Sequence, residues 1–273
     1  MKRITPRAHT VSRVRKTCGG SAGAVRTIRT MVEQQHVRET AGTPPETAPA
    51  SVLSVNVGRP RANPWKDTDL TGIDKQPVDG PVAVTEPGPK GTGAVGLAGD
   101  RVYDIKHHGG SDQAVYAYAR EDLDVWEREL GRPLRPGQFG ENLTTVGVDV
   151  SGALIGERWR IGSTLLEVAV PRIPCGTFQG WLGENGWIKR FTQAAVPGAY
   201  LRVVEPGVLR AGDRIEIVHR PEHRVTIALV FRASTTAPEL LPELLPAADA
   251  LPQEVADRVR RRLAENADAP AVG

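Results

Sequence analysis

The 273-residue chain has few cysteines, few aromatic residues and no long apolar run. Its two cysteines, Cys18 and Cys175, are too few for a disulfide framework, and they exclude a zinc site with four cysteine ligands. The absence of any run of 18 apolar residues excludes a membrane-spanning helix, so we expect no membrane partner. Because structural disulfides are not expected, we assign the protein to the reducing cytoplasm.

The basic residues are concentrated at the N-terminus. The first 30 residues contain eight Lys or Arg and no acidic residue, so the other 243 carry a net charge of −5 although the whole chain carries +3. Because the chain after residue 30 has a net negative charge, we expect no basic surface for nucleic acid on its folded part. We predict that residues 1–50 are a disordered basic tail and linker, or that the protein starts at Met31. A targeting segment is the alternative, although the apolar stretch of a signal peptide is missing.

The periodicity of apolar residues changes along the rest of the chain. A helical period predicts helices over 113–131, over 187–195 and near the C-terminus. Alternating residues bounded by Gly and Pro predict seven short strands, at 51–58, 81–86, 95–103, 153–162, 164–171, 199–207 and 213–220. Many strands with few helices indicate a mainly β fold. We predict a closed or nearly closed β-barrel over 51–220 and a short helical extension over 221–273.

The sequence PRIPCGTF places a lone thiol after an apolar strand. Cys175 follows a turn that contains two prolines, and Arg172 is close enough in sequence to favour the thiolate, which is both the nucleophile and the metal ligand. A soft sulfur suits a transition metal better than Mg²⁺ or Ca²⁺. The alternative is a buried structural cysteine, the common state of a free thiol.

The sequence DIKHHGGSDQAV has two adjacent histidines before two glycines. In a strand, His107 and His108 would point to opposite faces, so the pair fits a turn with one imidazole facing a ligand better than a shared metal. Zinc would need further ligands at suitable spacing, and none is found. Asp112 is expected to cap the helix that follows.

Two further segments have turn chemistry. In GQFGENLTT, Asn142 lies at the edge of a loop, where asparagine most often stabilises a turn. In GIDK, Lys75 lies where it could hold a phosphate, although most lysines are simply exposed to solvent. No Walker loop, dinucleotide-binding glycine motif or GxSxG elbow is present.

Taken in order, GIDK, GDRVYDIKHHGGSDQAVYAY, GQFGENLTT and PRIPCGTF resemble the MOSC domain family, named for the C-terminal domain of molybdenum cofactor sulfurases, and within it the YiiM-like branch. The resemblance runs from about residue 51 to 220 and more weakly through the C-terminal stretch. It implies a MOSC β-barrel and a molybdenum cofactor, with Cys175 as catalytic residue and thiolate ligand to the metal. The first 50 residues have no counterpart in the family pattern, and the C-terminal extension is shorter.

The resemblance also implies the residues of the cofactor pocket. Lys75 and Arg172 would be cationic anchors for the cofactor. The other pocket residues carried over by motif are His107, His108, Asn142, Thr177 and Arg190, although Arg190 also fits a solvated helix face.

The activity implied for this branch is reduction of N-hydroxylated compounds such as hydroxylaminopurines and hydroxylamines. No flavin, haem or iron–sulfur motif is present, so the electrons would come from a separate redox partner. A second hypothesis is a sulfur carrier or cofactor-handling protein that holds a persulfide on Cys175. A third is a metal-free binding barrel in which the thiol is structural.

Overall fold

The computed structural model describes residues 49–267, so nearly all of the predicted basic tail lies outside the described residues. The fold is mainly β, as predicted. The strands are β1 (Ser51–Ala62), β2 (Leu70–Pro77), β3 (Val82–Val84), β4 (Val115–Ala119), β5 (Leu143–Val146), β6 (Arg158–Ile161), β7 (Thr164–Pro171), β8 (Ala199–Glu205), β9 (Gly207–Leu209) and β10 (Ile215–His219). The helices are η1 (Ser111–Gln113), α2 (Arg120–Leu130), α3 (Gly176–Leu182), α4 (Trp187–Ala194), α5 (Ile227–Thr235), η2 (Pro238–Ala247) and α6 (Gln253–Ala267). None of the helices in this range is long and apolar enough to cross a membrane.

Eight strands form one sheet in the order β10-β6-β7-β8-β4-β5-β1-β2, and β3 pairs with β9 separately. The β4–β5 pair is parallel, and the other neighbours in this sheet are antiparallel. The prediction of a closed barrel is wrong, because no continuous ladder joins β10 to the other end of the sheet. The sheet does curl: Ser51 at the start of β1 forms an isolated bridge with Arg214, just before β10. Backbone hydrogen bonds such as Val52 N to Asp213 O, at 2.9 Å, reinforce this contact.

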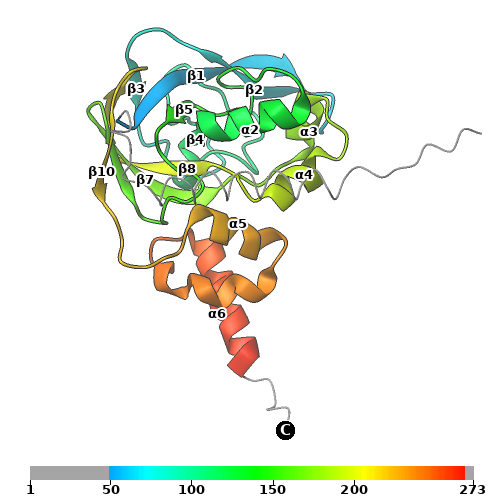
Figure 1. Cartoon of the computed structure of the whole chain (residues 1–273), viewed down its shortest axis with the longest axis vertical. Helices are drawn as coiled ribbons and strands as arrows, with labels where there is room; N and C mark the ends of the chain where they lie inside the picture. The colour runs from blue at the N-terminus through cyan, green and yellow to red at the C-terminus, as the bar shows by residue number, and fades with distance from the viewer. Residues whose placement is uncertain (1–48, 268–273) are drawn as a thin grey trace, which may run out of the picture.

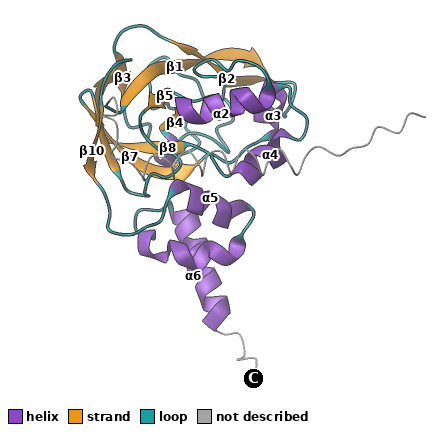
Figure 2. Cartoon of the chain, viewed as in Figure 1, coloured by secondary structure: helices purple, strands orange, loops and turns teal. Residues whose placement is uncertain are grey.

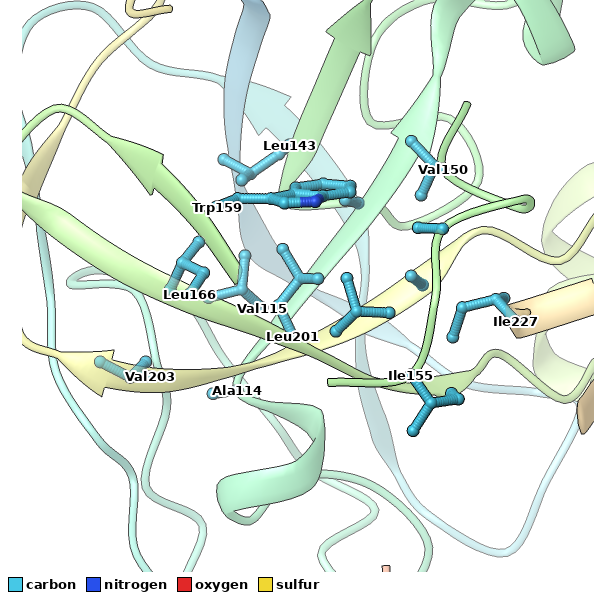
Figure 3. Packing of buried hydrophobic residues seen from close by; sticks show 14 of the residues in the cluster. Ala114, Val115, Leu143, Val150, Ile155, Trp159, Leu166, Leu201, Val203 and Ile227 are labelled. Carbon is cyan, nitrogen blue, oxygen red and sulfur yellow. The ribbon is translucent and has the colours of Figure 1, made fainter. Parts of the chain in front are cut away.

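An aliphatic core lies on the concave side of the curled sheet. Trp159 of β6 is its largest member and is fully buried, and it lies beside Leu143 of β5, four places away in the order of the sheet (Figure 3). Ile227 and Val230 of α5 belong to the same cluster, so the C-terminal extension packs on the sheet through its first helix. Figure 1 shows α5 and α6 together on one side of the sheet.

A second, aromatic cluster fixes α2, α3 and α4, which gather at the opposite end of the molecule from β10 (Figure 2). Phe139 is at its centre, with ring centroids 5.1 Å from Tyr118, 5.1 Å from Phe178 and 5.4 Å from Trp187. Edge-to-face contacts of this kind add to the stabilisation from burial. The cluster lies directly behind the turn that carries Cys175, because Phe178 is on α3 and Cys175 caps that helix.

Several local predictions need correction. The predicted helix over 113–131 is strand β4 followed by helix α2, because the alternating VYAYA segment is buried on both faces and pairs with β5 and β8. Residues 95–103 form a loop with one isolated bridge at Leu97 instead of a strand. β2, β5, β9 and α3 were not predicted from the sequence. The helix over 187–195 and the helical extension are confirmed.

We expect Phe139→Ala to lower the free energy of unfolding by about 3–5 kcal/mol, because it opens a cavity among five aromatic neighbours. Urea unfolding followed by fluorescence measures this, with Leu53→Ala, at a half-exposed position, as the control that changes stability by less than about 0.5 kcal/mol. Equal effects of the two substitutions would contradict a packing role for this cluster.

Candidate functional site

One pocket brings together most of the residues predicted for the site. It opens between β2, the loop over 94–104, the HHGG turn and the PRIPC turn, so segments far apart in the sequence form its walls. Its lining includes Lys75, Asp100, His108, Tyr116, Gly140, Asn142, Arg172, Cys175, Thr177 and Tyr200.

Cys175 ends the extended PRIPC segment and is the N-cap residue of α3. Its thiol is free and half-buried, and it lines the pocket. The backbone carbonyl of Cys175 accepts a hydrogen bond from Gln179 N at 3.1 Å, so the first turn of α3 fixes the position of the residue. The aromatic cluster holds α3 in turn through Phe178, and the thiol therefore sits on a rigid support.

Arg172 is the most unusual residue of the pocket. It is only 5% exposed, and its guanidinium lies 4.2 Å from the ring centroid of Phe178 and 5.1 Å from that of Tyr116. Nη1 donates to the carbonyl of Phe139 at 2.5 Å, but the buried Nε has no hydrogen-bond partner. No carboxylate in the described part of the chain forms an ion pair with it. A buried cation with an unused donor is costly unless an anion completes it, so this geometry favours an anionic ligand.

Gly140 gives Arg172 the room it needs. A Cβ at this position would lie 3.3 Å from Nη1 of Arg172, and the backbone has φ +77°, which favours glycine. The turn itself is organised by Glu141, whose buried carboxylate accepts from Gly137 N at 2.5 Å and Phe139 N at 3.0 Å. The GQFGENL segment thus serves turn chemistry, and it also shapes one wall of the pocket.

A buried polar network centred on Asp100 forms the floor of the pocket. The two oxygens of Asp100 accept from Lys75 Nζ at 2.6 and 2.7 Å, and Oδ1 also accepts from Gly58 N at 2.7 Å. Asn142 Nδ2 donates to Asp100 Oδ2 at 2.8 Å and to Asn56 O at 3.2 Å. Burial acts to raise the pKa of Asp100, but the Lys75 ammonium and these hydrogen bonds outweigh it and leave the pKa below its usual range.

This network changes the interpretation of two predicted residues. Lys75 and Asn142 both line the pocket, but each holds Asp100. Asn142 also accepts from the backbone N of Tyr116 at 3.0 Å, so both ends of its amide have protein partners. Lys75 and Asn142 therefore stabilise the pocket through Asp100, and their contact with a ligand stays a prediction.

The two adjacent histidines face different surroundings, as expected for a turn. His108 lines the pocket, and its pKa is lowered to about 4, first by burial and then by the nearby positive charge of Arg172. His108 is therefore a neutral imidazole near neutral pH. His107 is exposed and does not line the pocket: its Nδ1 lies 2.9 Å from Asp104 Oδ1 and 3.3 Å from Lys66 Nζ.

Of the two remaining predicted residues, Thr177 lies in the pocket and Arg190 lies outside it. Thr177 is buried, lines the pocket and donates to Asn63 Oδ1 at 3.3 Å. Arg190 does not line the pocket. It forms ion pairs with Glu129 of α2 at 3.1 Å and with Glu184 at 3.6 Å, and so connects α4 to its neighbours.

Sequence reasoning missed several residues of this pocket, among them Asp100, Tyr116 and Tyr200. Asp100 lies within the GDRVYDIKHHGG motif, but only the fold shows that it meets Lys75. Tyr116 and Tyr200 face each other across paired strands, with ring centroids 4.9 Å apart. Alternation within VYAYA is a signal that would have placed Tyr116 on a strand, whereas nothing local distinguishes Tyr200.

The donor set of the pocket limits which metal it can hold. No group of three or more His, Cys, Asp or Glu side chains within residues 49–267 is arranged to hold a metal ion. A metal in this pocket would take Cys175 as a protein ligand and most of its other ligands from elsewhere. A soft thiolate beside an anion-binding arginine fits a metal that arrives within an anionic organic cofactor.

Comparisons with known proteins agree on a family. A family model described as "MOSC domain" matches residues 104–216. "Uncharacterized protein YflK" of Bacillus subtilis (strain 168) is 32% identical over 183 residues, which are 67% of this chain and 79% of that protein. A protein named "Reductase" from Gibberella moniliformis is 29% identical over 229 residues; the match covers 80% of this chain and 39% of that longer protein. The crystal structure of YiiM from Geobacillus stearothermophilus superposes with a TM-score of 0.63 and 28% identity, over 79% of this chain and 100% of that one.

We expect Lys75→Met to lower the free energy of unfolding by about 3 kcal/mol, because it leaves the Asp100 carboxylate buried without its cation. The double variant Lys75→Met/Asp100→Leu should lose less than the sum of the two single losses. Urea unfolding of the four proteins measures the coupling. Arg260→Met, which breaks an exposed pair with Asp257, is the control and should cost less than about 1 kcal/mol. Additive losses would contradict a structural Lys75–Asp100 pair.

We expect the imidazole of His108 to titrate near pH 4, well below its usual value of 6.5. Between these values the unfolded chain binds a proton that the folded chain does not, so His108 makes stability fall as the pH drops from 6.5 to about 4. The His108→Asn variant should show a smaller fall over this window. Imidazole ¹³C chemical shifts, assigned with that variant, give the midpoint, and a midpoint at 6 or above would contradict a neutral, buried His108.

Proposed function

Because the chain belongs to the MOSC domain family, we propose that it binds a molybdenum cofactor in the Cys175 pocket and reduces N-hydroxylated compounds. The observation that carries the proposal is the juxtaposition of a free, half-buried thiol with a buried arginine whose Nε has no partner. A thiolate and an unneutralised guanidinium in one pocket match a cofactor that combines a soft metal with anionic groups.

Each residue of the pocket would have its own role in binding this cofactor. Cys175 would provide the thiolate ligand to molybdenum, and the guanidinium of Arg172 would hold an anionic group of the cofactor. His108, neutral and facing the pocket, offers a ring nitrogen as a hydrogen-bond partner without adding charge. The network of Lys75, Asp100 and Asn142 keeps the floor of the pocket rigid beneath them.

The proposed reaction is the two-electron reduction of an N–OH group. The N–O bond breaks, the nitrogen takes up two electrons and one proton to give the amine, and the oxygen leaves as water with a second proton. When bound, the cofactor supplies the metal that exchanges these electrons. The protein would position the substrate against that metal and exclude competing ligands, through the aromatic wall formed by Tyr116 and Tyr200.

The electrons are proposed to come from a separate donor protein in the cytoplasm. The sequence contains no flavin, haem or iron–sulfur motif of its own.

The test is the molybdenum content and the reductase activity of the full chain, purified from cells that make the cofactor. We expect stoichiometric molybdenum in the wild type and loss of both metal and activity in Cys175→Ser, because the variant lacks the thiolate ligand. Cys18→Ser is the matched control and should keep both. Elemental analysis measures the metal, and reduction of hydroxylamine with a chemical electron donor measures the activity.

Full activity in Cys175→Ser would contradict the proposal. If the wild type lacks molybdenum and native mass spectrometry shows one added sulfur atom on Cys175, the protein is instead a sulfur carrier. A wild type with neither would leave the thiol as a structural group of a binding protein.

A further inference from the structure

The tip of the β1–β2 hairpin, residues 63–69, lies at the mouth of the Cys175 pocket. Its first and last residues are joined, because Asn63 N donates to Asp69 O at 2.9 Å. Leu70, which follows the tip, lines the pocket and is 40% exposed, so the hairpin forms part of the rim. Figure 1 shows the outer ends of β1 and β2 beside α3, the helix that follows the thiol.

One side of the tip rests on helix α3. A Cβ on Gly180 would lie 2.2 Å from Cγ of Trp65, so the indole packs against the bare backbone of the helix. The carbonyl oxygen of Trp65 lies 3.5 Å from the position that a Cβ would take on Gly176, the residue directly after the thiol. Thr177 Oγ1 also donates to Asn63 Oδ1 at 3.3 Å. Trp65 thus covers the turn that presents the thiol.

The other side of the tip is attached to the opposite wall by charged side chains. Lys66 Nζ donates to Oδ2 of Asp104 and lies 3.3 Å from Nδ1 of His107. Asp104 lines the pocket just before the HHGG turn. Because an ion pair between partly exposed side chains contributes little to stability, this attachment breaks easily. The tip therefore bridges the two walls of the mouth.

The ladder between the two strands is irregular just below the tip. The strand pairing shifts register between Arg59 and Arg61. Pro60, which lies between them, has no N–H to donate to the ladder. Arg61 forms an ion pair with Asp74 across the shift at 2.6 Å, but its side chain is 59% exposed. A strand bends at such an irregularity, so the hairpin beyond Pro60 can tilt while the rest of the sheet stays in place.

We propose that the tip is a lid over the Cys175 pocket, which opens by releasing Lys66 from Asp104 and lifting Trp65 from α3. The structure shows the closed position, in which the tip contacts both walls of the mouth. The lid goes beyond the proposed function, because it controls access to the thiol whichever ligand the pocket takes.

The test is the rate at which iodoacetamide, a small uncharged reagent, alkylates Cys175 in the full chain. Cys18→Ser removes the other thiol and gives the parent protein. Purification from cells that cannot make the molybdenum cofactor leaves Cys175 without a competing ligand. When opening and closing are fast compared with alkylation, the rate follows the population of the open lid.

Both contacts of the tip are tested by substitutions at exposed positions. Lys66→Met should raise the rate about two- to fivefold, because it removes the ion pair. Trp65→Ala should raise it about tenfold or more, because it removes the cover from α3. The controls are Lys106→Met, which removes an exposed positive charge from the loop that carries Asp104, and Val218→Ala, at an exposed position on β10. Each control should change the rate by less than about twofold.

An exchange of the two charges separates the lid from other effects of substitution. Lys66→Asp alone should be alkylated faster than the parent, and Lys66→Asp/Asp104→Lys, which restores the pair, should return toward the parent rate. Equal rates in the parent, Lys66→Met and Trp65→Ala, or a charge exchange that leaves the rate high, would overturn the lid. The measurements need neither molybdenum nor reductase activity, so their outcome is independent of the proposed function.

Discussion

The pocket depends on one buried carboxylate, that of Asp100. It accepts hydrogen bonds from Lys75 of β2, Gly58 of β1 and Asn142 just before β5, and so connects the long loop over 85–114 to these three parts of the sheet. The Lys75 ammonium makes the ionised form stable despite burial. Since this loop carries the HHGG turn, the position of His108 follows from the same interaction.

Above this floor, two short motifs divide the interior between two cavities. PRIPC directs Arg172 and Cys175 into one cavity and Pro171 and Ile173 into the other, and the segment from Gly109 to Gln113 completes the partition. The chemistry of the two sides differs accordingly. One side offers a thiol and an arginine with an unused donor, and the other is lined by apolar and charged side chains, several of them from the C-terminal extension.

The sequence identified much of this arrangement, since its motifs pointed to Cys175, Arg172 and His108, which the fold brings to one pocket. It did not show what holds them, because Asp100 and Lys75 are 25 residues apart and meet only where the loop that carries Asp100 packs against β2. His107 belongs to the HHGG motif and Arg190 to the helix predicted after the PRIPC turn, yet local geometry turns the first outward and draws the second to Glu129. The VYAYA strand was misread because its helical continuation shares the apolar period, and barrel closure depends on hydrogen bonds between strands that no local pattern encodes.

The central claim is that the Cys175 sulfur binds molybdenum. A crystal structure of the protein purified with its cofactor, with anomalous data collected on both sides of the molybdenum edge, tests it most directly. The account predicts one anomalous peak within bonding distance of the Cys175 Sγ, with cofactor density reaching the guanidinium of Arg172. A peak anywhere else in the molecule, or cofactor density that leaves Cys175 and Arg172 without contact, would contradict it.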